Sequence, residues 1–114
     1  MAQTRRRGHR IGSGDPLLLI HGLSATCGVW EPVLPELERS FELLVPTLLG
    51  RYQSEPFARG VAPGVEALTD ALERELDAAG WDTAHVAGNL LGGWLALELA
   101  KRGRARSVVA LVVL

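Results

Sequence analysis

A glycine-rich segment in the second half of the chain has the composition of a sharp turn at a reactive centre. It reads Gly88-Asn89-Leu90-Leu91-Gly92-Gly93 and separates a short apolar run from a long apolar helical pattern. Glycines two positions before and two positions after residue 90 permit a tight strand-to-helix turn. Such a turn pushes the side chain of residue 90 outward at a helix N-terminus, where partial positive charge favours an anion. The alternative is that these glycines serve packing alone.

A second candidate turn, His21-Gly22-Leu23-Ser24, directly follows the apolar run Leu17–Ile20. In an open parallel sheet, ligands bind at the carboxyl ends of the strands, where this turn is expected. Backbone N–H groups there can point at a developing negative charge, and Gly22 lets the chain bend close to it. A His-Gly pair by itself also fits an ordinary strand-to-helix turn.

Alternating strand and helix patterns surround these two turns. Continuous apolar runs predict four strands, at Leu17–Ile20, Phe41–Leu48, His85–Ala87 and Ser107–Leu114. Helical spacing of apolar residues predicts three helices, at Trp30–Leu37, Val65–Ala79 and Leu91–Arg102. This order with right-handed crossovers predicts an α/β fold, a mostly parallel sheet with helices on both faces. Glycine and proline breaks predict a loop over residues 49–64.

The sequence also predicts whether four segments are solvated or buried. The basic N-terminus (Arg5, Arg6, Arg7, Arg10) and the acidic side of the helix Val65–Ala79 are expected to be solvated. The strand Ser107–Leu114 is expected to be covered on both faces, and the helix Leu91–Arg102 to be apolar nearly all round.

Composition narrows the class of protein. The chain has 114 residues, 47% of them hydrophobic, and a net charge of −1, which fits one globular domain and excludes a general nucleic-acid binder. Its single cysteine, Cys27, excludes an internal disulfide, and neither a membrane span nor a signal peptide is predicted. These features favour a cytoplasmic protein. No metal cluster, phosphate loop or dinucleotide fingerprint is found, so no cofactor and no metal are expected.

Three segments together resemble the α/β-hydrolase fold family: Leu17–Gly22 (LLLIHG), Pro46–Gly50 before Ser54, and Gly88–Ala100 (GNLLGGWLALELA). The resemblance implies a partial α/β-hydrolase fold in which residues 1–114 are the N-terminal portion of a single domain. The chain is then expected to stop after the strand that follows the elbow helix.

In that family the elbow reads Gly-x-Ser-x-Gly, and its serine attacks an ester or amide carbonyl. The resemblance implies that residue 90 occupies the nucleophile position. It further implies that Leu23 and Leu91 supply the N–H groups of the oxyanion hole, and that His21-Gly22 shapes its loop.

Three departures from the family pattern decide whether the chain is expected to be catalytically active. Position 90 is leucine, which has no nucleophilic atom. Residues 50–54 read Gly-Arg-Tyr-Gln-Ser where the family has Gly-His-Gly-x-Ser, and its acid and histidine belong downstream of Leu114. His9 and His85 are expected to be surface or sheet-packing residues. Ser24, Thr26 and Cys27 lie near the first turn but have no partnering base.

The sequence therefore predicts a hydrolase relative that is catalytically silent as written. One alternative is a non-catalytic module in which Leu90 and Leu91 extend an apolar floor for a small hydrophobic or ester-like molecule. Another is a half-domain that self-associates through the strand edge at residues 107–114. A further alternative is that the parent protein is a working hydrolase and this chain a variant with leucine in place of serine.

Overall fold

A computed structural model describes residues 9–22, 27–48 and 64–111. Its strands are β1 (His9–Gly12), β2 (Asp15–Ile20), β3 (Phe41–Val45), β4 (Ala84–Asn89) and β5 (Ala105–Leu111). Its helices are the 3₁₀ helix η2 (Cys27–Val33), α1 (Leu34–Leu37), α2 (Val65–Ala79) and α3 (Leu91–Lys101). Residues 49–63 of the predicted loop 49–64, the arginines 5–7 and the end of the last strand lie outside these ranges.

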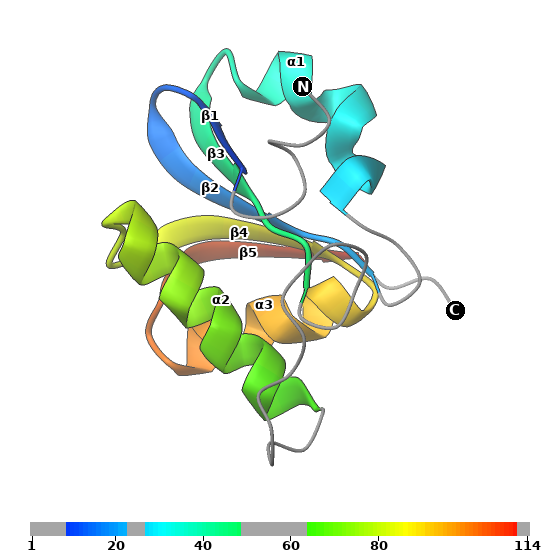
Figure 1. Cartoon of the computed structure of the whole chain (residues 1–114), viewed down its shortest axis with the longest axis vertical. Helices are drawn as coiled ribbons and strands as arrows, with labels where there is room; N and C mark the ends of the chain where they lie inside the picture. The colour runs from blue at the N-terminus through cyan, green and yellow to red at the C-terminus, as the bar shows by residue number, and fades with distance from the viewer. Residues whose placement is uncertain (1–8, 23–26, 49–63, 112–114) are drawn as a thin grey trace.

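The five strands form one sheet in the order β1-β3-β2-β4-β5 (Figure 1). Strands β3, β2, β4 and β5 run parallel to one another, and β1 pairs antiparallel with β3. The mostly parallel sheet predicted from the sequence is therefore confirmed. The edge strand β1 was not predicted, because HRIG carries one apolar residue and an edge strand shows no continuous apolar run.

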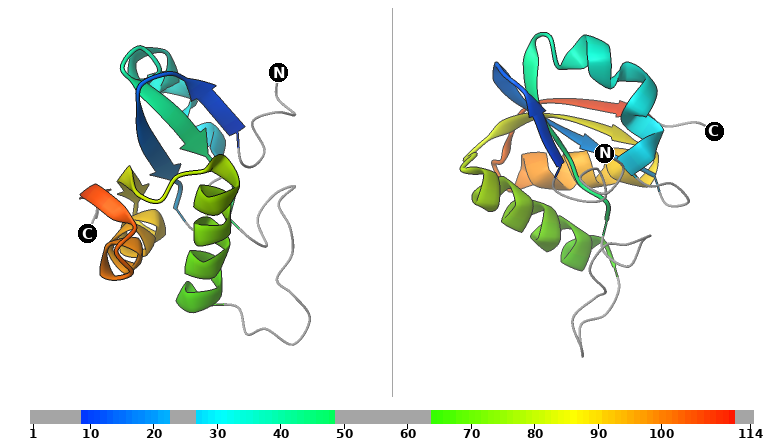
Figure 2. Two further views of the ribbon diagram at one scale, coloured as in Figure 1. Left: turned by 90° about the vertical axis from the view of Figure 1, so that its left-hand side faces the viewer. Right: turned by 45° about the horizontal axis from the view of Figure 1, so that its top comes forward.

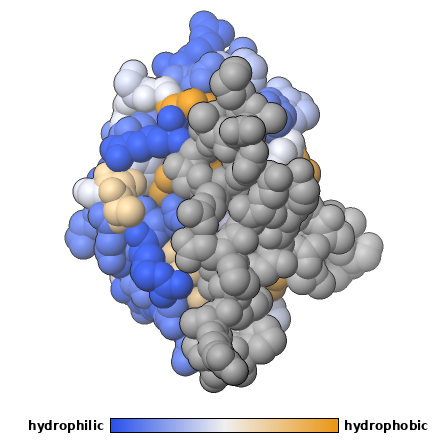
Figure 3. All heavy atoms as spheres, in the orientation of Figure 1, coloured by the Kyte–Doolittle hydropathy of each residue, from blue (hydrophilic) through white to orange (hydrophobic). Residues whose placement is uncertain are grey.

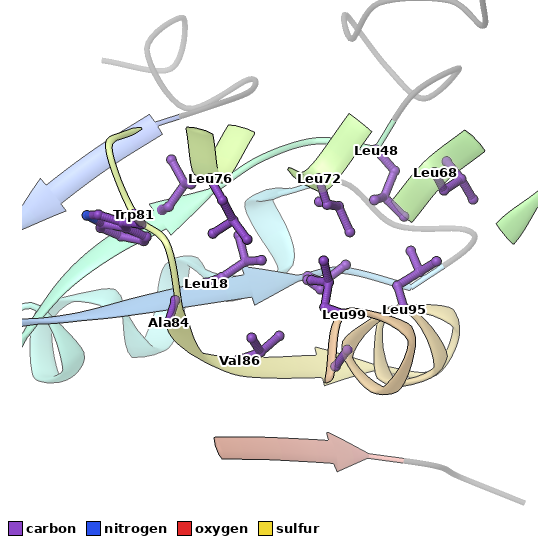
Figure 4. Close-up of a cluster of buried hydrophobic side chains, with 13 residues drawn as sticks. Leu18, Leu48, Leu68, Leu72, Leu76, Trp81, Ala84, Val86, Leu95 and Leu99 are labelled. Atoms are coloured by element: carbon purple, nitrogen blue, oxygen red, sulfur yellow. The ribbon is translucent and has the colours of Figure 1, made fainter. Parts of the chain in front are cut away.

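Helices cover both faces of the sheet, as predicted (Figure 2). On one face, Leu18 and Ile20 of β2 belong to the core that α2 and α3 complete. Figure 4 shows Leu72 of α2 and Leu99 of α3 among the buried side chains of this core. On the other face, Leu17 and Leu19 pack with residues of η2 and α1. The run Leu17–Ile20 is continuous in sequence because alternate side chains enter two different cores.

The helix predicted at Trp30–Leu37 forms, but its first part is a 3₁₀ helix. The chain forms the 3₁₀ helix η2 and then a single α-helical turn, α1. Pro32 lies inside η2, and its missing N–H removes one hydrogen bond from a regular helix. Leu34 is buried against the sheet, whereas Val33 is 43% exposed and leaves the predicted apolar stripe.

The acidic side of α2 is partly paired rather than simply solvated. Arg102 donates hydrogen bonds to Asp70 and Glu73, each at 2.7 Å. Arg104 reaches Glu73 at 2.8 Å and Asp77 at 2.7 Å. The hydrogen bonds from Arg102 and then Arg104, against the opposing effect of burial, lower the pKa of Glu73. Figure 3 shows a mostly hydrophilic surface over the exposed side of α2.

One arginine of the basic N-terminus is fixed in the fold. Arg10 lies in β1, forms an ion pair with Glu42 of β3 and stacks over Trp81, with its guanidinium carbon 5.4 Å from the ring centroid. The hydrogen bond from Arg10 holds the pKa of Glu42 below its ordinary value. The expectation of a wholly solvated terminus is wrong for this residue.

The last strand is covered on one face only in the described part of the chain. Val108 packs partly buried against the core that contains α3. Val109 and Leu111 are 57% and 51% exposed, so the predicted cover on both faces is wrong for these residues. Helix α3 is apolar nearly all round, as predicted, and it exposes Trp94 and Leu97. Among the described residues, no helix combines the length and the apolar character needed to cross a membrane.

Candidate functional site: the turn between β4 and α3

Residue 90 lies at the tip of a sharp turn that joins β4 to α3 (Figure 1). Leu90 has φ 56° and ψ −115°, and it is the one non-glycine residue with positive φ in the described ranges. A leucine in such a conformation costs about 1–3 kcal/mol and persists only where the surrounding structure fixes it.

Main-chain hydrogen bonds fix this conformation. The carbonyl oxygen of Leu90 accepts from the N–H groups of Gly93 at 2.8 Å and Trp94 at 3.2 Å, which begins the helical ladder. The N–H of Leu90 donates to the carbonyl of Leu111 at 2.8 Å. The turn is thereby tied both to its own helix and to the neighbouring strand β5.

The flanking glycines allow backbone segments to approach closely. A β-carbon on Gly88 would lie 2.0 Å from the carbonyl oxygen of Gly92. A β-carbon on Gly92 would lie 2.3 Å from the carbonyl oxygen of Ile20, at the end of β2. Both distances are below van der Waals contact, so these two positions require glycine. Gly93 has more room, since a β-carbon there would lie 3.3 Å from the β-carbon of Ala110.

The two leucines of the turn differ in environment. The side chain of Leu90 is 43% exposed, whereas Leu91 packs against the core. Leu91 is the first residue of α3, so its N–H has no acceptor within the helix. The turn therefore offers a helix N-terminus beside an exposed apolar side chain with no atom that could attack a carbonyl.

His21 anchors the first turn rather than serving as a free base. Its side chain is fully buried, and its Nε2 accepts a hydrogen bond from the N–H of Leu48 at 2.9 Å. Because an amide N–H can only donate, Nδ1 carries the proton and donates to the carbonyl of Gly22 at 2.7 Å. The imidazole is neutral in this arrangement and joins the end of β2 to the segment that follows β3.

The structure brings the two predicted turns together. Strands β2 and β4 are neighbours, with Ile20 opposite Gly88, so both turns leave the same edge of the sheet. A β-carbon on Gly22 would lie 3.2 Å from the carbonyl oxygen of Asn89 and 3.4 Å from the β-carbon of Leu90. The predicted oxyanion-hole residue Leu23, together with Ser24 and Thr26, lies outside the described residues, as does the side chain of Cys27.

The other predicted histidines lie away from this turn. His85 is near the start of β4, at the far end of the strand from Leu90. It packs edge-on against Phe41, with ring centroids 6.2 Å apart, as expected for a sheet-packing residue. Its Nδ1 also lies 2.7 Å from Oγ of Ser107, a contact that the sequence did not indicate. His9 opens β1, and its side chain is outside the described part.

No candidate metal site occurs in the described ranges, where no group of three or more His, Cys, Asp or Glu side chains is placed to hold an ion. The absence of a cofactor remains a prediction.

A mostly parallel sheet with a strained turn at the carboxyl end of β4, beside a helix N-terminus, is the arrangement of the α/β proteins that carry a nucleophile elbow. The chain belongs to the alpha/beta hydrolase family, whose sequence model matches residues 17–114.

Individual relatives agree with this assignment. The chain is 34% identical over 98 residues to the 2-hydroxy-6-oxo-2,4-heptadienoate hydrolase of Pseudomonas putida, covering 82% of this chain and 35% of that protein. It is 59% identical over 44 residues to epoxide hydrolase EphH of Mycobacterium tuberculosis, covering 39% of this chain and 21% of that protein. The crystal structure of an alpha/beta hydrolase from Sphaerobacter thermophilus superposes with a TM-score of 0.78 at 28% identity, covering 89% of this chain and 38% of that one. The chain thus spans about a fifth to two fifths of the length of these relatives.

Proposed function

We propose that this chain carries the elbow and the oxyanion loop of an α/β-hydrolase site that is silent for acyl transfer at residue 90. The observation that carries the proposal is Leu90 itself. Its backbone has positive φ and its side chain is exposed at the strand-to-helix turn. This is the place for an attacking atom, and leucine has none.

The mechanism of serine hydrolases shows what the absence of a nucleophile at residue 90 removes. There a serine attacks the carbonyl, a histidine takes its proton, and backbone N–H groups stabilise the oxyanion. The N–H groups of Leu91 and Leu23 are the proposed donors. Without nucleophile and base, oxyanion stabilisation and binding alone leave about 10³–10⁴-fold acceleration over water in a complete site. The similar hydrolases named above support a hydrolase ancestry for the elbow.

A comparison of variants at residue 90 tests this proposal. We expect the parent and Leu90→Ala to hydrolyse a p-nitrophenyl ester at the same rate, because the leucine side chain contributes no chemistry. Leu90→Ser is expected to add little, since the described residues at this edge offer no free histidine: Nε2 of His21 is occupied by Leu48. Turnover that falls with Leu90→Ala, or rises a hundredfold or more with Leu90→Ser, contradicts the proposal.

A second candidate function, binding of a small hydrophobic or ester-like molecule, is favoured by the exposed apolar side chain of Leu90 beside Gly22. Apolar walls with a few polar groups are typical of small-molecule sites. A fluorescent hydrophobic probe should then bind saturably to one site, and Leu90→Asp should weaken its binding at least tenfold. Uptake that does not saturate, or that is unchanged in Leu90→Asp, contradicts this function.

A third candidate, self-association through the strand edge at residues 107–114, is favoured by the exposed Val109 and Leu111 on the last strand of the sheet order. Sedimentation at micromolar concentration tests it. A dimer that Val109→Lys dissociates supports self-association, and a folded monomer contradicts it.

A further inference from the structure

Three polar side chains meet on the face of the sheet that η2 and α1 cover, at the opposite end of β4 from Leu90. They are Asp15 of β2, His85 of β4 and Ser107 of β5. The register places His85 opposite Leu17 on one side and opposite Ser107 on the other. Three adjacent parallel strands therefore supply a carboxylate, an imidazole and a hydroxyl to one place.

The distances order these groups as acid, base and nucleophile. Nδ1 of His85 lies 2.7 Å from Oγ of Ser107, and Nε2 of His85 lies 4.0 Å from Oδ2 of Asp15. A carboxylate near Nε2 favours the proton on that nitrogen. In the tautomer with the proton on Nε2, Nδ1 is the acceptor and the hydroxyl of Ser107 donates its hydrogen bond to His85. This is the arrangement in which an imidazole can take a proton from serine.

The same three residues line a pocket of about 480 Å³. The rest of its wall is mainly apolar and includes Leu19 and Trp30. The volume lies within the usual range for small-molecule sites. Trp30 gives independent support for a ligand in this pocket. Its buried Nε1–H has no acceptor in the described part of the chain, so a bound molecule could supply one. An apolar acyl chain fits this wall better than a charged ligand does.

We propose that Ser107 is a nucleophile activated by His85, and that the pocket takes activated esters of apolar carboxylic acids. Oγ of Ser107 forms a bond to the carbonyl carbon while its proton passes to Nδ1 of His85. The ester bond to the leaving oxygen breaks, and that oxygen receives the proton from His85. Water then attacks the acyl-serine, with His85 taking a proton from the water and returning it to Oγ. Asp15 is a positioning residue that sets the tautomer of His85.

An alkyl fluorophosphonate applied to the whole chain tests this site. Oγ bonds to phosphorus, fluoride leaves, and the proton passes through His85 to solvent. Intact mass and peptide mapping are expected to show one adduct, on Ser107, that is absent in Ser107→Ala and unchanged in the control Ser40→Ala. His85→Gln should slow labelling at least about a hundredfold, as general bases contribute about 10²–10⁴-fold.

Further readouts separate chemistry from folding. Asp15→Asn should lower the maximal labelling rate without changing the probe concentration at half-maximal rate, and Asp15→Glu should restore part of the rate. Circular dichroism confirms that each variant is folded. Absence of an adduct on the folded parent, an adduct on Ser13, Ser24, Ser40 or Ser54 instead, or an unchanged rate in folded His85→Gln overturns the proposal.

This test is separate from that of the elbow. Residues 84–106 contain no serine, threonine or cysteine, so no adduct on a side chain of these types can form at the turn. Variants of residue 90 should leave labelling of Ser107 unchanged, and Ser107→Ala should leave the effect of residue 90 on turnover unchanged.

Discussion

The N–H of Leu48 donates a hydrogen bond to Nε2 of the buried His21 at 2.9 Å, which joins the chain after β3 to the chain after β2. This bond crosses 27 positions of sequence and holds His21 next to Gly22, which lies close to the turn at Leu90. The buried imidazole of His21 therefore has a structural role, although it lies beside the site where a catalytic base would be expected.

Replacing His21 should test this role. His21→Leu leaves the buried N–H of Leu48 without an acceptor, which costs about 1–3 kcal/mol of unfolding free energy. His21→Gln keeps an acceptor and should cost less. Urea denaturation of the two variants measures the difference, and equal stability of His21→Leu and the parent contradicts the role.

Leu90→Gly should stabilise the chain, because glycine adopts positive φ without the strain that leucine bears. Glycine also raises the conformational entropy of the unfolded chain, which offsets part of this effect. We therefore expect the unfolding free energy to rise by about 1 kcal/mol. Leu97→Gly is the matched control, since Leu97 is similarly exposed but lies within α3. This variant should lower the unfolding free energy by about 0.5–1 kcal/mol. The two changes in urea midpoint should therefore have opposite signs.

Gly88→Ala should destabilise the fold, because the new β-carbon would meet the carbonyl of Gly92 at 2.0 Å. Overpacking of this kind costs about 1–3 kcal/mol, and backbone on both sides of the clash leaves little room to relax. Gly64→Ala provides the control, since no atom of the described residues lies within 4 Å of its β-carbon position. If both variants melt at the same temperature, the close approach of residues 88 and 92 is wrong.

Acid should weaken the fold through Glu73. Its pKa is lowered in the folded chain by hydrogen bonds from Arg102 and Arg104, against the opposing effect of burial. A depressed carboxyl pKa contributes stability above the unfolded pKa, near 4.3, and this stability is lost as the pH falls through the folded value. Glu73→Gln should flatten the decline of unfolding free energy below about pH 4.3.

Salt provides a second measurement for this ion-pair cluster. The paired side chains are partly exposed, so added salt screens them and should reduce the difference between Glu73→Gln and the parent. Ala78→Gln, on an exposed position of the same helix, controls for adding a glutamine to α2. If the difference in unfolding free energy between Glu73→Gln and the parent does not change with salt, Glu73 stabilises the fold by packing and not by charge.

Local sequence patterns were sufficient for the regular elements and for the turn. Leu17–Ile20 predicted a strand buried on both faces, and the structure sends its side chains alternately into two cores. The end of α2 follows from Gly80, whose φ of 79° suits glycine. The strand, glycine spacing and apolar helix around residue 90 likewise placed the sharp turn, because this geometry depends on backbone clearance.

Contacts between distant residues were not predictable from these patterns. Arg102 and Arg104 pair with α2 across about thirty positions of sequence, and only the packing of α2 beside α3 brings them together. The contact of His85 with Ser107 likewise depends on the register of β4 against β5. Apolar content alone did not show which face of β5 lacks cover, since both faces carry valine or leucine.

In the described part of the chain, the hydrogen bonds that hold the elbow at Leu90 join main-chain atoms: Gly93 and Trp94 donate to its carbonyl, and its N–H donates to the carbonyl of Leu111. The identity of the residue at the tip is thus uncoupled from the architecture that presents it. Substitution at this position can therefore occur while the scaffold persists, and reactivity would return only if a base were also supplied nearby.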